Sequence, residues 1–443
     1  MSFYCVELPY QSNAARFYAA IADLPWAVWL DSCGMSRYDI LSAAPQRTIL
    51  LDEASTNSDP FALVRSALGA QIAPIAGVPF AGGALGYWSY DLARSMYALP
   101  NIAQDVGLLP DMAIGIYDWA LVLDHYQKTA RLVSHRRFAE TVELLPHVLK
   151  CLQNNLPLPP DTFRLQGDIS SNFTPERYAV AFEVVQGYIK SGDCYQINLA
   201  QRFNAAATGD AYGAYLRLRR LSPAPYSAFL NLPQAQILCA SPERFLRVQN
   251  GSVETKPIKG TRPRGRDAQQ DIRLAEELRN HPKDRAENLM IVDLLRSDLG
   301  KSCVPGSVHV DKLFEVESFA SVHHLVSTVV GTLGEGRDAP DVLRDCFPGG
   351  SVTGAPKLRA MQIIEQLEPH RRGIYCGAIG YIGFDGNMDT NIAIRTLVYS
   401  DNEICCWAGG GIVADSDAEA EYQETLDKAS AMLKLMQGYK REA

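Results

Sequence analysis

A lysine stands at the centre of a short basic segment, ETKPIKGTRPRG, at residues 254–265. The prolines and glycines of this segment predict a turn-rich loop of fixed conformation. Lys259 shares the loop with Lys256, Arg262 and Arg264. These residue types point to a lysine amine that is neutral enough to react, or to a pocket for an anion. The alternative is a solvated basic loop, and the segment alone does not decide between them.

Two predicted helices each carry a pair of carboxylates three residues apart. The pairs are Asp284 with Glu287 and Glu421 with Glu424. This spacing places both members of a pair on one helical face, and carboxylate oxygens on rigid elements are ligands that Mg²⁺ prefers. Glu287 also leads into an apolar stripe, where a buried carboxylate needs a partner or a metal. The alternative to a Mg²⁺ site is that both pairs are solvated helix surface.

A glycine-rich turn precedes a predicted helix in CFPGGSVTGAPKLRAMQIIEQLEP, residues 346–369. Free N–H groups at a helix start attract carboxylate or phosphate. A P-loop is rejected, because Ala355 and Pro356 separate Gly354 from Lys357, whereas that motif needs the lysine directly after the glycine. The segment therefore predicts an anion site or a plain helix cap.

Single polar residues interrupt several apolar, strand-like runs. His323 or His324 in SVHHLVSTVVG is either a hydrogen-bonded core residue or a catalytic group. Arg395 lies in the apolar run AIRT, and burying a guanidinium favours a carboxylate ligand nearby. Glu243 in SPERF is a candidate proton carrier or a salt-bridge partner, and Tyr375 is equally open. Together these groups indicate an enzyme with a pocket for a small polycarboxylate.

The elements that must position these residues are predicted from periodicity. Strands are predicted at 236–241, 245–249, 377–384, 391–400 and 403–414. Helices are predicted after Thr174, over 273–301 with a possible break at Pro282, and over 418–439. Strands that follow one another without helical crossovers favour an antiparallel, α+β architecture.

A change of composition divides the chain. Residues 151–175 are rich in Pro, Asn and Ser and predict a linker. We therefore expect a β-rich N-terminal lobe over 1–150 and a catalytic lobe over 176–443, which holds nearly every candidate residue.

Composition restricts the class of protein. The 443 residues carry a formal net charge of −8, which disfavours nucleic acid as a partner because phosphate neutralisation needs a basic stripe. Ten cysteines without a CxxC pair are expected to be reduced core residues of a cytoplasmic protein. No signal peptide is recognised, and no apolar run approaches the roughly 20 residues that span a bilayer.

A series of motifs, in the correct order over about 190–435, resembles the chorismate-utilising enzymes. They are SGDCYQINLAQRF (191–203), SPERF (241–245), PIKGTRPRG (257–265), KDRAENLMIVDLLRSDLG (283–300), HHLVST (323–328), FPGGSVTGAPKLRAMQIIEQLEP (347–369), GAIGYIG (377–383), MDTNIAIRT (388–396) and AGGGIVADSDAEAEYQET (408–425). The first lobe is similar more loosely, through SRYDIL (36–41) and GALGYWSYDLAR (83–94). The resemblance implies two large, mainly antiparallel β-sheets packed as a sandwich with helices outside.

The resemblance also implies a reaction. PIKGT resembles the segment found in the enzymes that aminate chorismate to 4-amino-4-deoxychorismate, towards para-aminobenzoate and folate. Anthranilate synthase carries alanine in place of Lys259. The resemblance implies that the Lys259 amine attacks the chorismate ring and expels the hydroxyl, after which ammonia displaces the lysine. Repulsion from Lys256, Arg262 and Arg264, with partial burial, is expected to lower the pKa of this amine.

Further roles are carried over from the resemblance alone. Glu243 matches the general acid–base residue, and His324 lines the same site. The implied Mg²⁺ ligands are Glu287, Glu421 and Glu424, with Asp284 beside them. The implied substrate contacts are Gly260, Thr261, Lys357, Tyr375, Gly377, Arg395, Gly409, Gly410, Gly411 and Gln196. Glutamine at position 196 disfavours the isochorismate and salicylate branches, which carry lysine there.

The resemblance implies partners as well. The chain has no Gly-x-Cys-x-Gly nucleophile motif, so a separate glutamine amidotransferase subunit is expected to deliver ammonia. A tryptophan site is considered near Ser32, Ser36 and the turn Pro225-Tyr226-Ser227. The rival functions are anthranilate synthase component I and a catalytically silent binding subunit.

Overall fold

Two large β-sheets with antiparallel neighbours form the centre of the computed structural model, which describes residues 3–52, 59–107, 109–154, 157–319 and 322–440. The strand order in the first sheet is β1 (Tyr4–Leu8), β8 (Thr129–Ser134), β7 (Ala120–Asp124), β3 (Tyr38–Ser42), β2 (Ala27–Asp31), β11 (Tyr226–Asn231), β12 (Gln236–Ser241), β21 (Thr396–Ser400), β22 (Glu403–Ile412), β10 (Gln196–Thr208) and β18 (Gly354–Ala355), and β9 (Arg164–Ser171) also pairs with β10. The order in the second sheet is β15 (Ile258–Pro263), β17 (Val322–Thr332), β14 (Ser252–Thr255), β13 (Arg244–Gln249), β20 (Met388–Ile392), β19 (Ala378–Gly383), β5 (Gly83–Trp88), β6 (Met112–Tyr117) and β4 (Arg47–Leu51), and β16 (His309–Ser318) also pairs with β17.

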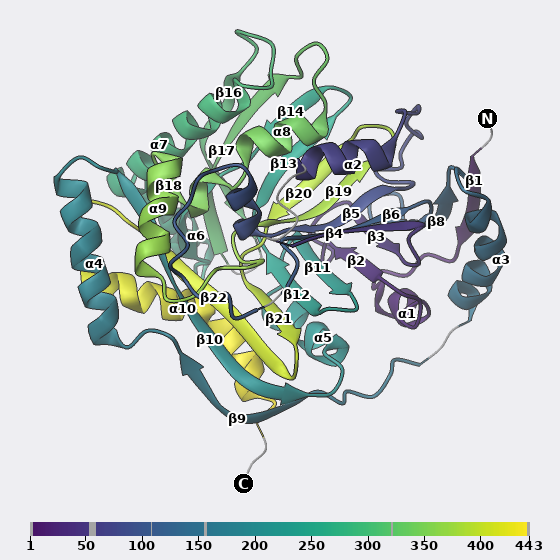
Figure 1. Ribbon diagram of the computed structural model, residues 1–443, viewed down its shortest axis with the longest axis horizontal. Coiled ribbons are helices and arrows are strands. Elements are labelled where there is room, and N and C mark those ends of the chain that lie inside the picture. The colour runs from purple at the N-terminus through teal and green to yellow at the C-terminus, as the bar shows by residue number, and fades with distance from the viewer. Residues whose placement is uncertain (1–2, 53–58, 108, 155–156, 320–321, 441–443) are drawn as a thin grey trace.

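Strands from the first third of the chain enter both sheets. β2 pairs with β11 in the first sheet, and β5 pairs with β19 in the second. In Figure 1 these purple and blue strands lie beside teal and yellow strands from much later in the chain. The segment that was predicted as a linker, 151–175, contains the end of a helix and strand β9. The segments 1–150 and 176–443 therefore share two continuous sheets.

Helices cover the outer faces of the sheets (Figure 1). They are α1 (Ala15–Ala19), α2 (Pro60–Leu68), α3 (Ala139–Gln153), α4 (Pro175–Lys190), α5 (Tyr212–Leu221), α6 (Ala268–Asn280), α7 (Pro282–Leu299), α8 (Ala339–Cys346), α9 (Lys357–Leu367) and α10 (Ala418–Gln437), with short 3₁₀ turns η2 (Tyr90–Ser95) and η3 (Gly350–Val352). The predicted break at Pro282 separates α6 from α7, and Thr174 caps α4 as its sequence predicts.

Apolar side chains fill the space between the sheets and beneath the helices. The core between the sheets includes Trp88, Ile237 and Ile379, which are almost fully buried. A second core lies under α5 and α10 and includes Phe229 and Met432. The predicted α+β sandwich with helices outside is confirmed.

Two local predictions were wrong. The predicted loop at 254–265 contains β15, an edge strand of the second sheet. The predicted strand 391–400 is divided between β20 and β21, which belong to different sheets. Arg395 lies at the division with a φ of 50°, in the left-handed region that β-strands do not use.

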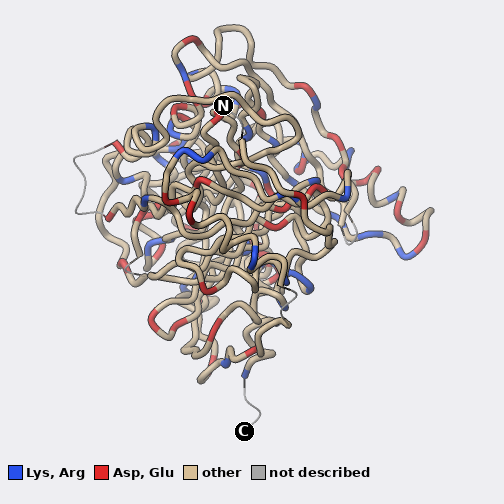
Figure 2. Tube along the Cα trace, turned by 90° about the vertical axis from the view of Figure 1, so that its right-hand side faces the viewer, with Lys and Arg blue, Asp and Glu red and all other residues tan. Residues whose placement is uncertain are grey.

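Charged residues of both signs are interspersed over the trace in Figure 2. The formal net charge of the sequence is −8. Among the described helices, none is both long and apolar enough to cross a membrane.

Candidate active site

Lys259 lies on β15, where a bulge brings the strand close to α7. The register against β17 shifts between Lys259 and Thr261, and Gly260 between them has a φ of 77°. A Cβ atom on Gly260 would lie 2.8 Å from the carboxyl carbon of Asp284. Glycine is therefore required here both by the backbone conformation and by the close approach of α7.

The amine of Lys259 lies in a desolvated environment. Its Nζ donates a hydrogen bond to the carbonyl oxygen of Ser351, at 3.4 Å. Burial lowers the pKa of Lys259, and Lys428 lowers it further, against the opposing effect of Glu287 and other acids. Because burial disfavours the charged form, a larger fraction of this amine is neutral and nucleophilic than in a solvated lysine.

The basic neighbours that the sequence suggested do not supply this repulsion. Lys256 forms an ion pair with Glu317, and Arg264 forms one with Asp271 at 2.7 Å. Arg262 is paired with acidic residues of both α6 and α7. Each positive charge is thus compensated, and the expected mechanism of the pKa shift was wrong in this respect.

Glu243 lies in the turn between β12 and β13, and its carboxyl group is buried. The hydroxyl of Ser351 donates a hydrogen bond to Glu243 Oε1 at 2.9 Å. Burial raises the pKa of Glu243 to about 7, against the lowering effects of Ser351 and Lys259. A carboxyl group with a pKa near neutrality can hold a proton and release it, as a general acid–base group must.

The carboxylates of Glu421 and Glu424 extend from α10 towards the glycine-rich strand β22. A Cβ atom on Gly410 would lie 2.9 Å from Glu421 Oε2 and 3.4 Å from Glu424 Oε1. Ser416 donates a hydrogen bond to the other oxygen of Glu421, at 2.6 Å. Glu421 Oε2 is buried and has no hydrogen-bond partner, so this oxygen is suited to a cation.

The second carboxylate pair, on α7, is divided between two environments. Burial raises the pKa of Glu287, and the opposing effect of the nearby Lys259 charge is smaller. Asp284 instead accepts from Arg262 at 3.1 Å and lies 3.0 Å from a ring nitrogen of His281. Asp284 is therefore already paired with basic groups.

The carboxylates fit a cation that is completed by substrate. Among the described residues, no three His, Cys, Asp or Glu side chains converge closely enough to form a metal site by themselves. Mg²⁺ usually binds one or two carboxylates together with substrate oxygens and water. The unpartnered oxygen of Glu421, which lies close to Gly410, is suited to be one such carboxylate ligand.

Arg395 and His324 lie close enough to affect each other electrostatically. Within the described chain, the Arg395 guanidinium has no hydrogen-bond or ion-pair partner, and burial lowers its pKa. His324 Nδ1 lies 2.9 Å from Thr261 Oγ1. Burial and the charge of Arg395 lower the pKa of His324 to about 4, so this histidine is neutral near pH 7. An unpaired guanidinium beside a neutral histidine suits a carboxylate ligand.

Gln196 adds an unsatisfied amide at the end of β10. Both amide atoms of its side chain are buried without a hydrogen-bond partner. A Cβ atom on Gly411 would lie 2.7 Å from Gln196 Nε2. Buried polar groups are normally hydrogen-bonded, so this amide is suited to a ligand or an ordered water.

The remaining predicted substrate contacts lie in different environments. Gly409 and Gly411 belong to β22, and the buried Tyr375 lies just before Gly377, where a Cβ would lie 2.2 Å from the carbonyl oxygen of Trp88. Lys357 is buried, and its amine donates to Asp298 at 2.7 Å and to a backbone carbonyl. That amine is thus occupied by an internal ion pair.

The structure also brings in residues that sequence reasoning missed. Ser351 contacts both Glu243 and Lys259. Lys428 lies one helical turn after Glu424, contacts it at 2.5 Å, and donates to the Gly409 carbonyl at 3.2 Å. The i,i+4 spacing from a predicted ligand was an available signal for Lys428, whereas Ser351 had none beyond its glycine-rich surroundings.

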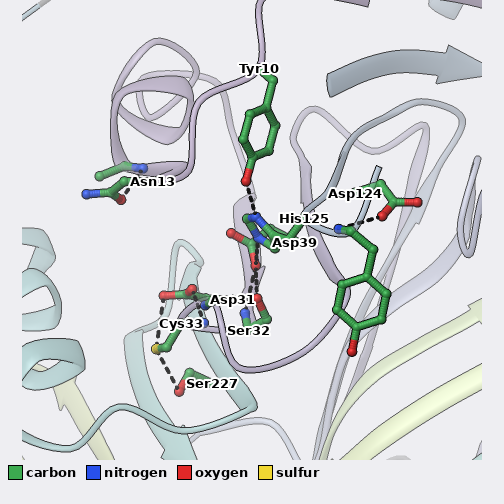
Figure 3. Close-up of polar contacts among 12 residues, drawn as sticks. Tyr10, Asn13, Asp31, Ser32, Cys33, Asp39, Asp124, His125 and Ser227 are labelled. Carbon is green, nitrogen blue, oxygen red and sulfur yellow. Dashed lines mark hydrogen bonds and ion pairs between the residues drawn. The ribbon is translucent and has the colours of Figure 1, made fainter. Parts of the chain in front are cut away.

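The residues of the considered tryptophan site line one cavity of about 640 Å³ between the two sheets. Ser32, Ser36, Pro225, Tyr226 and Ser227 all contribute to its wall. Figure 3 shows a chain of contacts beside it, from Tyr10 through His125 and Asp39 to Ser32. This network holds the Ser32 turn, so the cavity wall is fixed by buried polar contacts.

Comparisons with known proteins agree with this architecture. The chain is 48% identical to aminodeoxychorismate synthase component 1 of Escherichia coli (strain K12), over 98% of either chain. It is 40% identical to anthranilate synthase component 1 of Aquifex aeolicus (strain VF5), over 81% of this chain and 75% of that one. Its fold superimposes on the crystal structure of anthranilate synthase component I from Streptococcus pneumoniae TIGR4 with a TM-score of 0.81 and 35% identity, over 90% and 92% of the chains.

The family model described as chorismate binding enzyme matches residues 26–434, a range that includes the catalytic candidates on both sheets and on α7 and α10. The chain belongs to the chorismate binding enzymes.

Proposed function

We propose that the chain is the aminating component of an aminodeoxychorismate synthase. In this reaction chorismate and ammonia give 4-amino-4-deoxychorismate and water. The observation that carries the proposal is the pair formed by Lys259 and Glu243, which both contact Ser351. The similarity to aminodeoxychorismate synthase component 1 over nearly the whole chain supports it.

Lys259 acts as the nucleophile in this proposal. Its neutral amine adds to the conjugated ring, the double bond shifts, and the hydroxyl leaves from the far end of the conjugated system. Ammonia then adds at the carbon that lost the hydroxyl, and the lysine departs with the reverse shift. Two displacements of this kind replace one difficult direct displacement, and the lowered pKa of Lys259 favours the first.

Glu243 supplies the proton in the first displacement. Its carboxyl, protonated below about pH 7 because burial raises its pKa, donates to the departing hydroxyl, which leaves as water. The resulting carboxylate is stabilised by Ser351 and by the cationic lysine that has just formed its bond. The same carboxylate can take up the proton that the incoming ammonia loses.

Glu287, Glu421 and Glu424 would hold Mg²⁺, with Asp284 beside them. When bound, the ion neutralises and orients the ring carboxylate of chorismate. The chain's own groups then surround the substrate: Arg395 pairs with a carboxylate, and Tyr375, His324, Thr261 and Gln196 provide polar contacts. The backbone at Gly260, Gly377 and Gly409–Gly411 allows close approach, and Lys357 fixes α9 through its internal ion pair.

A separate subunit would provide the ammonia. The relatives are named component 1, which implies a second component. We propose a glutamine amidotransferase in that role, and free ammonium should replace it in solution. The purified chain should therefore aminate chorismate with ammonium and Mg²⁺ but not with glutamine alone.

Product analysis distinguishes this function from that of anthranilate synthase, the second candidate, which the similarity to anthranilate synthase component 1 favours. The purified chain is supplied with chorismate, Mg²⁺ and ammonium, and the product is identified by chromatography and mass spectrometry. We expect 4-amino-4-deoxychorismate, and we expect much less of it from the Glu421→Ala and Glu287→Ala variants at a Mg²⁺ concentration that just supports the parent. Anthranilate formed without any added lyase would contradict the proposal, and absence of turnover would indicate a silent binding subunit.

We further propose that the cavity lined by Ser32 and Ser227 binds tryptophan. Its wall combines aromatic and charged groups, including Tyr226, Asp31 and Arg244, which suits an aromatic zwitterion. Tryptophan should raise the melting temperature of the chain in a concentration-dependent way. An unchanged melting temperature at millimolar tryptophan would contradict this part of the proposal.

A further inference from the structure

Arg372 is the most completely buried guanidinium near the candidate active site, with 1% of the residue exposed. It forms a two-bond ion pair with Glu368, through Nε at 2.9 Å and Nη2 at 2.6 Å. Glu368 also accepts a hydrogen bond from the backbone N–H of Ala200, on β10, at 2.9 Å. The charge is therefore compensated inside the fold and is not free for substrate.

The other donors of Arg372 bind backbone carbonyls beside the active site. Nη1 donates to Val352 at 2.9 Å, and Nη2 donates to Asn198 at 2.6 Å. Val352 follows Ser351, and Asn198 pairs with Gly411 on β22. One side chain thus connects the segment that contacts Lys259 and Glu243 with the strand next to the glycine-rich strand.

Two aromatic rings enclose the guanidinium. Its central carbon lies 4.8 Å from the ring of Tyr90 and 5.6 Å from the ring of Tyr375. Tyr90 belongs to the early motif GALGYWSYDLAR, and its neighbour Asp91 accepts a hydrogen bond from the N–H of Gly373 at 2.7 Å. The early part of the chain therefore takes part in holding the Arg372 segment.

We infer that Arg372, held by Glu368, is a positioning residue that fixes Ser351 and thereby the relative placement of Glu243 and Lys259. The inference rests on the proposed function. A planar guanidinium can bind a carboxylate with two bonds and still donate to two carbonyls, whereas a lysine amine cannot reproduce that fork. Replacing buried ion pairs by apolar residues is often neutral for stability, so a variant that removes both charges can separate a positioning role from a purely structural one.

The test compares the chain with Arg372→Lys and with the double variant Arg372→Met, Glu368→Met. We expect kcat for ammonium-dependent amination to fall about 100-fold, as is typical for a displaced catalytic group, while the folded state is retained by circular dichroism. The alkaline limb of the kcat/KM profile, set by Glu243, should move to higher pH. The reason is that the Ser351 hydrogen bond lowers the pKa of Glu243, and this bond is weakened when Ser351 is displaced.

Ser351→Ala provides a second route, because this small change should fold whatever happens to the arginine variants. Ser351→Ala should reproduce the shift of the alkaline limb to higher pH. Adding Arg372→Lys should change the profile little further, since both substitutions remove the same hydrogen bond, from Ser351 to Glu243. The matched control is Arg202→Met, Glu403→Met, which removes the ion pair of another buried arginine and should keep the parental profile.

Additive effects, or arginine variants with a parental kcat and alkaline limb, would overturn the inference. A lower melting temperature without a displaced limb would also overturn it, because it would show a purely structural role. Failure of the parent chain to aminate chorismate would instead refute the proposed function, so the two failures are distinguishable.

Discussion

Glu243 and Lys259 lie in one desolvated environment and affect each other's protonation. Burial opposes a charge on either group, so the neutral pair, a protonated carboxyl and a free amine, is favoured relative to solvent. That is the combination that the proposed first displacement needs, because in it the amine attacks while the carboxyl donates a proton. Storing such groups in the folded state usually reduces stability.

Replacing Glu243 should therefore change how stability depends on pH. The folded pKa of about 7 lies above that of the unfolded carboxyl, so the contribution of Glu243 is greatest at low pH and is lost as pH rises through about 7. The Glu243→Gln variant has no carboxyl group at this position, so it does not lose this stability as pH rises. Its stability relative to the parent should rise by up to about 3 kcal/mol between about pH 5 and pH 8, measured by denaturant unfolding. Parallel curves would show that Glu243 is not buried in this way.

At the residue scale, the chemical type of each candidate side chain could be predicted from the sequence, but its orientation and its partners could not. Lys259 as the nucleophile stays a prediction, whereas the expectation that Arg262 and Arg264 repel it was wrong because both are in ion pairs. Ion pairing depends on which residues of α6 face β15, and no local pattern contains that information. Ser351 was missed for the same reason, since its partners lie far away in the chain.

At the scale of elements, the acidic residues Asp284 and Glu287 of α7 lie in different surroundings. Asp284 holds α7 against β15 through Arg262, over the space left by Gly260. Glu287 is close enough to Lys259 for the lysine to lower its pKa, and its ion pair is with Lys283, at 4.0 Å. The spacing of the two residues predicts a common helical face but cannot reveal that an arginine occupies one carboxylate.

Substitutions of these two residues should differ in their effect on metal dependence. Glu287→Ala should raise the Mg²⁺ concentration needed for half-maximal amination by about tenfold or more, because it removes a proposed ligand. Asp284→Ala should change this concentration by less than about threefold and lower stability by about 1 kcal/mol, as expected for a partly exposed ion pair. Titrating Mg²⁺ into each variant measures the half-maximal concentrations, and denaturant unfolding measures the stability. Equal effects of the two substitutions on the Mg²⁺ concentration would assign Asp284 to the metal site.

The close approach of Glu421 and Glu424 to Gly410 gives a second prediction at this scale. Gly410→Ala places a methyl group beside Glu421 and Glu424. Mg²⁺ should therefore bind more weakly, and amination should need a higher Mg²⁺ concentration, while the strand persists. Gly187→Ala on α4 is the control, because nothing lies within 4 Å of its new Cβ. An unchanged Mg²⁺ requirement in Gly410→Ala would place the metal elsewhere.

At the scale of the whole molecule, the two sheets are built jointly from early and late parts of the chain. The sequence predicted the α+β class correctly because alternating apolar runs report strands directly. It did not show that β5 lies beside β19 or β2 beside β11, since pairing over such distances is set by packing between the sheets. The change of composition at 151–175 marks a surface segment and does not mark the end of a sheet.

This arrangement predicts that the segments 1–150 and 176–443 will not fold alone. Each fragment would expose unpaired sheet edges and half of the core between the sheets, which favours aggregation. Expressed separately, both should lack a cooperative thermal transition by circular dichroism. An independently folded 176–443 fragment with amination activity would contradict this view.

The central claim is that Lys259 forms a temporary carbon–nitrogen bond with chorismate. The direct measurement is to incubate the chain with chorismate and Mg²⁺ without ammonium, quench rapidly, and map peptides by mass spectrometry. We predict an adduct with the mass of chorismate less one water on the peptide that contains Lys259, absent in Lys259→Ala and retained in Lys256→Ala. Full amination activity in Lys259→Ala, or an adduct on another residue, would contradict the account.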